Sequence, residues 1–326
     1  MKRILITGAS GFIGSHLVDG ALRKGMETYA AIRKTSKREY LQDAKIHVAE
    51  IDFNAPESLR KLLKSTPFDY IIHTAGTTHA PNPETYNRVN SGTLQILVEL
   101  IQEEQIPLQK FVYLSSLAAF GPNENHTGRL ISNDSRPMPV TAYGRSKLLA
   151  EEYLQKQAIP WVIIRPTAVY GPRDRSFLPI YRSIGSGFEI YFTRKKQKLS
   201  FVYIHDLVDA IYRSLDGPAQ TAYFVSDGCE YSLQEFFQVI KTIRNKKTIP
   251  VYLPTGMIRQ IATLNELFCK PFGVYPFFNS EKVNELVASG WMCDLNHLIT
   301  STGFQPGYTL KKGMAETLEF YKKKGF

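Results

Sequence analysis

The chain has 326 residues, of which 43% are hydrophobic and 21% charged, so it can bury a sizeable core and is neither disordered, collagen-like nor coiled-coil. Forty basic and thirty acidic side chains give a formal net charge of +10, but the basic residues are scattered. This distribution favours an anionic small-molecule cofactor over nucleic acid. The three cysteines follow no zinc-binding pattern, and no apolar run approaches the ~18 residues of a transmembrane helix. We therefore expect a cytoplasmic protein without a metal site.

Over residues 1–170, short apolar runs rich in β-branched residues alternate with amphipathic stretches of helical length. The predicted strands are Arg3–Thr7, Glu27–Ile32, Lys45–Ala49, Tyr70–Thr74, Phe111–Ser115 and Trp161–Arg165. The predicted helices are Phe12–Lys24, Pro56–Lys64, Pro83–Glu104 and Tyr143–Gln157. This alternation is typical of a parallel sheet covered on both faces. The predicted fold class is thus α/β, a doubly wound parallel sheet (Rossmann fold).

After Pro172 the alternation changes. Two further strands, Ser200–Ile204 and Thr221–Val225, flank a predicted helix at Asp206–Leu215, and the chain beyond Ser232 is predicted to be mostly helical. We predict a nucleotide-binding domain over residues 1–172, to which residues 200–226 return. Residues 173–199 and 227–326 would form a smaller, mostly helical substrate-binding domain.

A glycine-rich turn follows the first predicted strand, with the pattern Gly8-x-x-Gly11-x-x-Gly14. Such a turn needs its first glycine for a tight bend, its second for close approach of backbone N–H groups to a pyrophosphate, and its third for helix–strand packing. Because ligands of doubly wound sheets bind at this kind of junction, the turn predicts a dinucleotide site.

The end of the second predicted strand bears on which dinucleotide is bound. Arg33 and Lys34 stand there, where an acidic residue would contact the ribose 2′-hydroxyl of NAD. Cations would instead pair with the 2′-phosphate of NADP, so the sequence favours NADP, with NAD as the alternative. A solvent-facing strand end without any such role is the other interpretation.

A candidate acid–base pair lies at Tyr143 and Lys147, four residues apart on one face of a predicted helix. A phenol has a reference pKa near 10, which a neighbouring ammonium lowers. The pair suits proton transfer to or from a secondary alcohol while a nicotinamide exchanges the hydride. Alternatively, Lys147 simply covers a buried tyrosine. Ser116, after the fifth predicted strand, lies where open α/β sheets place active-site groups.

Together these motifs resemble the extended short-chain dehydrogenase/reductases, the NAD-dependent epimerase/dehydratase group. Further matches, which extend over essentially the whole chain, are Asp52-Phe53, His73–Gly76, Val89–Thr93, Arg165–Pro172 and Phe201–Asp206. The resemblance implies that Ser116 hydrogen-bonds the substrate oxygen, that Tyr143 is the general acid/base, and that Lys147 holds the nicotinamide ribose. It implies cofactor contacts from Gly8, Ser10, Gly11, Phe12, Ile13, Gly14, Arg33, Asp52, Phe53, Ala75, Lys147, Pro166 and Val169. Arg165 and Asn90 are expected to be structural.

The same resemblance narrows the chemistry. Leu117 and Ala118 stand where dehydratases of the family carry an Asp-Glu pair, which makes dehydration improbable. Leu199 stands where nucleotide-sugar members carry a diphosphate-binding Arg, which weakens the interpretation as a nucleotide-sugar enzyme. The motifs Trp291–Asp294 and Thr302–Pro306 resemble the dihydroflavonol-reductase and 3β-hydroxysteroid-dehydrogenase-like branch. We predict an NAD(P)-dependent oxidoreductase that acts on a small-molecule secondary alcohol or ketone, with a homodimer as a candidate assembly. The alternatives are a nucleotide-sugar epimerase and a non-catalytic NADP(H)-sensing or RNA-binding relative.

Apolar residues also recur at helical spacing near the C-terminus, at Met257, Ile261, Leu264 and Phe268, together with Ile258 and Leu267. The favoured interpretation is a helix buried against the smaller domain. The alternatives are a wall or lid of an apolar substrate pocket, or a helix that rests on membrane lipid.

Overall fold

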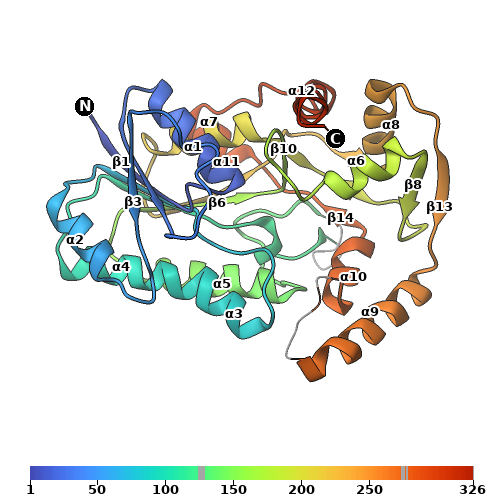
Figure 1. Cartoon of the computed structure of the whole chain (residues 1–326), viewed down its shortest axis with the longest axis horizontal. Helices are drawn as coiled ribbons and strands as arrows, with labels where there is room; N and C mark the ends of the chain where they lie inside the picture. Colours follow the sequence, from blue (N-terminus) through green and yellow to red (C-terminus); the bar gives the residue numbers. More distant parts are fainter. Residues whose placement is uncertain (124–128, 273–275, 277, 326) are drawn as a thin grey trace.

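A central sheet of seven strands, all parallel, organises the computed structural model, which describes residues 1–123, 129–272, 276 and 278–325 (Figure 1). The strands, in spatial order, are β11 (Thr221–Val225), β6 (Trp161–Pro166), β5 (Lys110–Leu114), β4 (Tyr70–His73), β1 (Arg3–Thr7), β2 (Glu27–Ile32) and β3 (Ile46–Glu50). The order reverses between β1 and β4, so the connections from these two neighbours leave in opposite directions. The predicted doubly wound sheet is confirmed.

Helices cover both faces of the sheet. The helices α1 (Phe12–Arg23) and α7 (Ile204–Ser214) pack on one face, and α2 (Glu57–Ser65), α4 (Thr93–Glu103) and α5 (Ala142–Leu154) pack on the other (Figure 1). Successive residues of a strand point to opposite faces. Accordingly, Ile4 and Ile6 belong to the core under α1, whereas Leu5 belongs to the core under α4. Burial on both faces explains why the sheet strands read as nearly continuous apolar runs.

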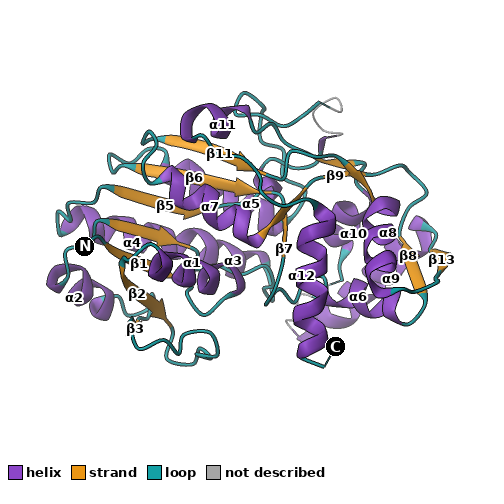
Figure 2. Ribbon diagram, turned by 90° about the horizontal axis from the view of Figure 1, so that it is seen from above, coloured by secondary structure: helices purple, strands orange, loops and turns teal. Residues whose placement is uncertain are grey.

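A second group of elements lies beyond the end of the sheet at which the strands finish (Figure 2). Its helices are α6 (Leu178–Gly185), α8 (Leu233–Arg244), α9 (Thr255–Cys269), α10 (Ser280–Val287) and α12 (Leu310–Lys323), while α11 (Asn296–Thr302) packs beside β11. Its strands form a parallel pair, β8 (Phe188–Tyr191) with β13 (Ile249–Tyr252), and a set of three, β9 (Lys198–Leu199), β12 (Tyr231–Ser232) and β14 (Gly290–Trp291). The predicted division of the chain into two domains stays a prediction.

Two predicted elements differ from the structure. The single helix predicted over Pro83–Glu104 contains a π-helical turn (Arg88–Gly92) between α3 (Pro83–Asn87) and α4, and Asn90 of this turn accepts a hydrogen bond from the Thr77 N–H. The strand predicted at Ser200–Ile204 is β10 (Phe201–Tyr203), which pairs with β7 (Ala168–Tyr170) outside the central sheet. Only β11 of the late strands joins that sheet.

The predicted burial of the apolar helix near the C-terminus holds for Ile258 and is wrong for the other residues named. In α9, Ile258 and Ala262 are buried, but Met257, Ile261, Leu264, Leu267 and Phe268 are exposed. The helix turns a narrow face inward, and its apolar stripe points away from the core. None of the described helices is both long and apolar enough to cross a membrane.

Candidate active site

The turn between β1 and α1 is shaped by glycine. Gly8 has φ +69°, and a Cβ there would lie 2.7 Å from the backbone nitrogen of Ala75. A Cβ at Gly14 would lie 2.2 Å from the carbonyl oxygen of Gly8, so neither position accepts a side chain. Gly11 is exposed at the start of α1, and no side chain caps this helix end. The backbone N–H groups of the first helical turn are therefore available to a phosphate, and the turn fits a dinucleotide.

The other residues expected to contact the cofactor lie near the carboxyl ends of consecutive sheet strands. Ser10, Phe12 and Ile13 belong to the β1–α1 turn, Arg33 follows β2, Asp52 and Phe53 follow β3, Ala75 follows β4, and Pro166 and Val169 end β6 and enter β7. Arg33 is exposed, and the Asp52 carboxylate accepts a hydrogen bond of 2.9 Å from the Asn54 backbone N–H. The structure thus brings these residues to the carboxyl-end side of the central sheet. Their contacts with a cofactor stay predictions.

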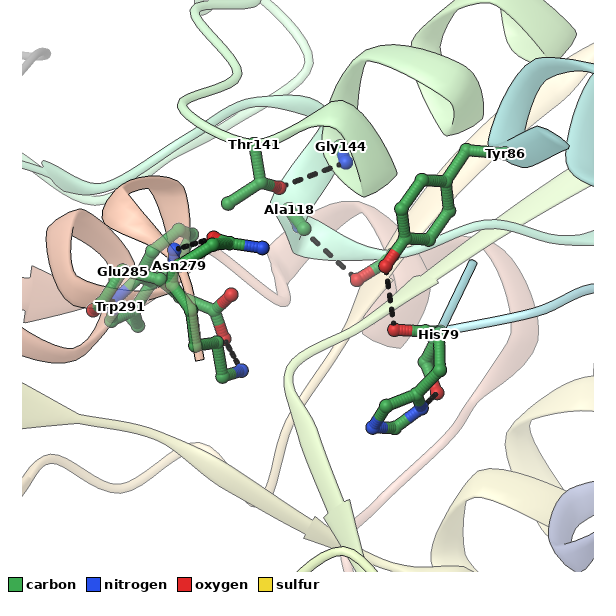
Figure 3. Close-up of polar contacts among 11 residues, drawn as sticks. His79, Tyr86, Ala118, Thr141, Gly144, Asn279, Glu285 and Trp291 are labelled. Atoms are coloured by element: carbon green, nitrogen blue, oxygen red, sulfur yellow. Dashed lines mark hydrogen bonds and ion pairs between the residues drawn. The ribbon is translucent and has the colours of Figure 1, made fainter. Parts of the chain in front are cut away.

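The Ser116 hydroxyl and the Tyr143 phenol meet where β5 and α5 come together. Thr141 caps α5 by accepting a hydrogen bond of 3.0 Å from the Gly144 N–H (Figure 3). A Cβ at Gly144 would lie 2.2 Å from the carbonyl oxygen of Ala118, so glycine lets the start of α5 approach the short helix that follows β5. This approach places Tyr143 beside the Ser116 hydroxyl, which acts to lower the pKa of the phenol. Burial raises the pKa of Tyr143 to about 12, against the lowering effect of the Ser116 hydroxyl. The lowering expected from the neighbouring ammonium is therefore wrong for this structure, in which desolvation of the phenol dominates.

Lys147 lies one helical turn beyond Tyr143 and is buried. Its Nζ donates a hydrogen bond of 2.8 Å to the carbonyl oxygen of Leu114 and lies 4.9 Å from the centre of the Tyr113 ring. Burial lowers its pKa to about 8, against the opposing effect of the Glu151 carboxylate. A Cβ at Gly76 would lie 3.5 Å from this Nζ, so the segment that follows β4 also reaches the ammonium group.

A buried ion pair between Glu151 and Arg165 holds α5 against β6. Glu151, four residues beyond Lys147, accepts hydrogen bonds of 2.7 and 3.0 Å from the Arg165 guanidinium, and the Ser115 hydroxyl donates to its other oxygen. Arg165 also donates a hydrogen bond of 2.8 Å to the Asn133 side chain. Arg165 is therefore structural, as predicted. The sequence reasoning missed Glu151, although its four-residue spacing from Lys147 placed it on the same helix face.

Asn90 also has a structural role, as predicted. Its side-chain oxygen accepts a hydrogen bond of 2.7 Å from the Thr77 N–H, and its amide donates to the Thr77 carbonyl at 3.0 Å and to the Ser146 hydroxyl at 2.9 Å. These bonds join the segment after β4 to α5. Asn90 thus fixes the position of the helix that carries Tyr143 and Lys147.

Side chains from distant parts of the sequence surround the tyrosine. The ring of Tyr86, on α3, meets the Tyr143 ring edge-on with centroids 6.3 Å apart, and the Glu285 carboxylate on α10 contributes to the raised pKa of Tyr143. Glu281, also on α10, accepts a hydrogen bond from the Ala142 N–H at the start of α5. Figure 3 shows Tyr86 and Glu285 on opposite sides of the segment that carries Ala118. No local pattern in the sequence could have revealed these contacts.

Comparison with known proteins identifies the family. Residues 4–225 match the model of the NAD dependent epimerase/dehydratase family. The chain belongs to this family. Its members are enzymes, so the predicted family and the enzyme class are both confirmed. Among the described residues of this family member, no group of three or more His, Cys, Asp or Glu side chains could hold a metal ion.

Two curated relatives align with nearly the whole length of this chain. UDP-glucose 4-epimerase from Vibrio cholerae is 28% identical, with 98% of this chain and 95% of the relative aligned. Ceramide reductase from Caulobacter vibrioides is 23% identical, with 99% and 95% aligned.

Solved structures show the same fold. UDP-glucose 4-epimerase from Thermotoga maritima superposes with a TM-score of 0.81 at 20% identity, covering 99% of this chain and all of that one. UDP-glucuronic acid 4-epimerase from Bacillus cereus, in complex with UDP-glucuronic acid and NAD, superposes with a TM-score of 0.79 at 22% identity, covering 99% of both chains. At these identities the likeness establishes the architecture alone.

Proposed function

We propose that this enzyme transfers a hydride between a nicotinamide cofactor and the carbon of a secondary alcohol or ketone, with Tyr143 as the general acid/base. The proposal rests on one observation, the placement of Ser116 beside the buried Tyr143 with Lys147 one turn along α5. This group lies at the same end of the sheet as the glycine turn between β1 and α1. A bound dinucleotide would supply the hydride donor or acceptor.

The protein's own residues would handle the proton. Because the pKa of Tyr143 is raised to about 12, its phenol is protonated at neutral pH and can donate to a carbonyl oxygen that gains charge during reduction. The resulting phenolate would be stabilised by the Ser116 hydroxyl and by the positive charge of Lys147. In the reverse direction the same groups would accept the proton of the alcohol. Ser116 would also orient the substrate oxygen.

The proposed cofactor is NADP, with NAD as the alternative. Arg33 and Lys34 are exposed after β2, and the next strand offers Asp52, whose carboxylate already bonds the Asn54 N–H. The Bacillus cereus relative holds NAD, which keeps that alternative open. The expected cytoplasmic location and homodimer stay predictions.

Replacing Arg33 by Ala should weaken NADPH binding about 10- to 100-fold, because a charge-assisted contact with the 2′-phosphate contributes on the order of 1.5–3 kcal/mol. NADH binding should hardly change. Fluorescence titration of both dinucleotides would measure this. Arg38→Ala is the matched control, because Arg38 already pairs with Glu50 at 2.6 Å. Tighter binding of NADH than NADPH by the unsubstituted protein, or equal losses of both in Arg33→Ala, would contradict an NADP preference.

Epimerisation of a nucleotide sugar is the second candidate function. It is favoured by the alignment with the Vibrio cholerae epimerase over nearly both full lengths. Against it stands Leu199 on β9, because a leucine side chain cannot bind a diphosphate.

The two functions differ in whether cofactor is consumed. The protein would be incubated with NADPH or NADH and a panel of ketones, and separately with UDP- and dTDP-sugars, while nicotinamide absorbance and product stereochemistry are followed. We expect net cofactor consumption with a ketone. Interconversion of sugars without net consumption would replace the first function by the second. Catalysis in neither assay together with no dinucleotide binding would contradict both.

A further inference from the structure

The helix α9 presents an apolar stripe to solvent. The stripe consists of Met257, Ile261, Leu264 and Phe268, which are 41%, 50%, 65% and 73% exposed, and it is continued by Phe272, which is 71% exposed. Spacings of three and four residues place these side chains on one side of the helix. Single exposed apolar residues are ordinary, but a contiguous row of this length marks a surface that binds something.

The stripe is fixed in place by a neighbouring side of α9. Ile258 and Ala262 pack with Val283 of α10 in a small core of their own. Glu266 accepts hydrogen bonds of 2.7 and 3.1 Å from the backbone N–H and hydroxyl of Ser280, at the start of α10. Figure 1 shows α9 at the outer edge of the molecule, away from the sheet. The apolar stripe is therefore a built feature of the surface.

Positive charge lies at one end of the stripe. The helix α9 itself carries two charged side chains, Arg259 and Glu266, of which Glu266 bonds inward to Ser280. The loop after β8 adds Arg194, Lys195 and Lys196, all exposed, and residues 190–198 contain no acid. Two contacts hold this loop beside the start of α9.

These contacts are well defined. The Thr255 hydroxyl, at the first residue of α9, donates a hydrogen bond of 3.1 Å to the carbonyl oxygen of Phe192. The Arg194 guanidinium lies 5.6 Å from the centre of the Tyr252 ring, just before the helix. The positive charge is thus concentrated at one end of the apolar stripe.

We propose that this face docks on an anionic lipid bilayer, with α9 lying in the interface. The apolar stripe would enter the boundary between headgroups and acyl chains, while the loop at Arg194–Lys196 would contact anionic headgroups. A second copy of the chain fits less well, because a symmetric dimer through this face would bring two identical basic borders together. The polar side of α9, with Arg259 and Thr263, faces away from the stripe and would remain in water.

The proposed docking face is also linked to the candidate active site. The hydrogen bonds of Glu266 join α9 to α10, and Glu281 of α10 binds the Ala142 N–H at the start of α5. The bilayer-facing helix is thus connected through one neighbour to the helix that carries Tyr143. The inference concerns binding alone and does not depend on the proposed reaction.

Sedimentation with vesicles tests the proposal. The full-length protein should sediment with vesicles of phosphatidylcholine and phosphatidylglycerol, much less with phosphatidylcholine alone, and less as salt is raised. The double variant Leu264→Ser, Phe268→Ser should lose at least about tenfold in vesicle affinity, because its apolar contact is removed. Lys195→Glu with Lys196→Glu should remove the preference for anionic lipid.

Ile299→Ser is the matched control, because Ile299 is a 38% exposed apolar residue on α11, outside the stripe. It should bind vesicles like the unsubstituted protein. Thermal unfolding should be unchanged in every variant, since all the substituted side chains are exposed. Failure of the unsubstituted protein to bind anionic vesicles, or undiminished binding by the double serine variant, would overturn the proposal. So would a dimer in solution that the double variant converts to a monomer while neither form binds vesicles.

Discussion

Replacing Tyr143 by Phe should reduce the turnover rate by about 10²- to 10⁴-fold, the usual contribution of a positioned general acid or base. The substitution keeps the ring and its edge-on contact with Tyr86 but removes the proton that the phenol would donate. Dinucleotide affinity should stay nearly unchanged, because Tyr143 is assigned no contact with the cofactor. Steady-state kinetics on the substrate found in the ketone and sugar assays would measure the rate, and titration would measure the affinity.

Tyr86→Phe is the control for this experiment. Its hydroxyl donates a hydrogen bond of 3.1 Å to the carbonyl oxygen of Thr78, so it loses a phenol beside the same ring without losing a proton carrier. We expect less than about a tenfold loss from one neutral hydrogen bond. If Tyr143→Phe kept a rate similar to that of Tyr86→Phe, another group would carry the proton. The assignment of Tyr143 would then be wrong, even if hydride transfer itself were observed.

The central sheet could be predicted because its evidence is local. Burial on both faces makes runs such as Ile4–Ile6 continuously apolar, and the glycine turn marks the first strand–helix junction. Phe201–Tyr203 is as apolar and as buried as the sheet strands, yet it pairs with β7 elsewhere. Nothing within three residues distinguishes these two outcomes, because pairing depends on distant partners. The π turn at Asn90 was missed because helical periodicity does not reveal it, and the Asn90 side chain bonds the backbone of the distant Thr77.

In the candidate site, too, contacts within one helix could be predicted and contacts between distant segments could not. Tyr143 and Lys147 share a helix, so their spacing alone indicates that they lie close together. The approach of Glu285 and Glu281 to the start of α5 depends on how the C-terminal segment folds back, which no local pattern contains. For α9, the periodicity shows an apolar stripe, but not that the stripe would face solvent. The inward face rests on Ile258 and Ala262, which lie on another side of the helix.

Replacing Lys147 by Met should abolish turnover and also stabilise the protein at neutral pH. Burial lowers the pKa of Lys147 from 10.5 to about 8. Between these two values the unfolded chain binds a proton that the folded protein does not, so the stability of the unsubstituted protein rises with pH across this window. Below pH 8 both states are protonated, and the folded protein bears the full cost of a buried ammonium. Met fills similar space without a charge.

We therefore expect Lys147→Met to raise the free energy of unfolding at neutral pH by on the order of 2–3 kcal/mol, with the gain shrinking as pH rises through the window from about 8 to 10.5. Urea unfolding at several pH values would measure this. Lys156→Met, at an exposed position just after α5, is the control and should change stability by less than about 0.5 kcal/mol.

The two effects of Lys147→Met together distinguish a functional lysine from a structural one. A lysine kept for the fold would have its hydrogen bond to Leu114 and its contact with the Tyr113 ring outweigh the desolvation cost, so removing it would destabilise the protein. A lysine kept for catalysis reduces stability, and its removal yields a more stable and inactive protein. Destabilisation at neutral pH, or retention of activity and dinucleotide affinity in a folded Lys147→Met variant, would refute the catalytic assignment. Stabilisation with loss of both would show that burying this ammonium serves the reaction rather than the fold.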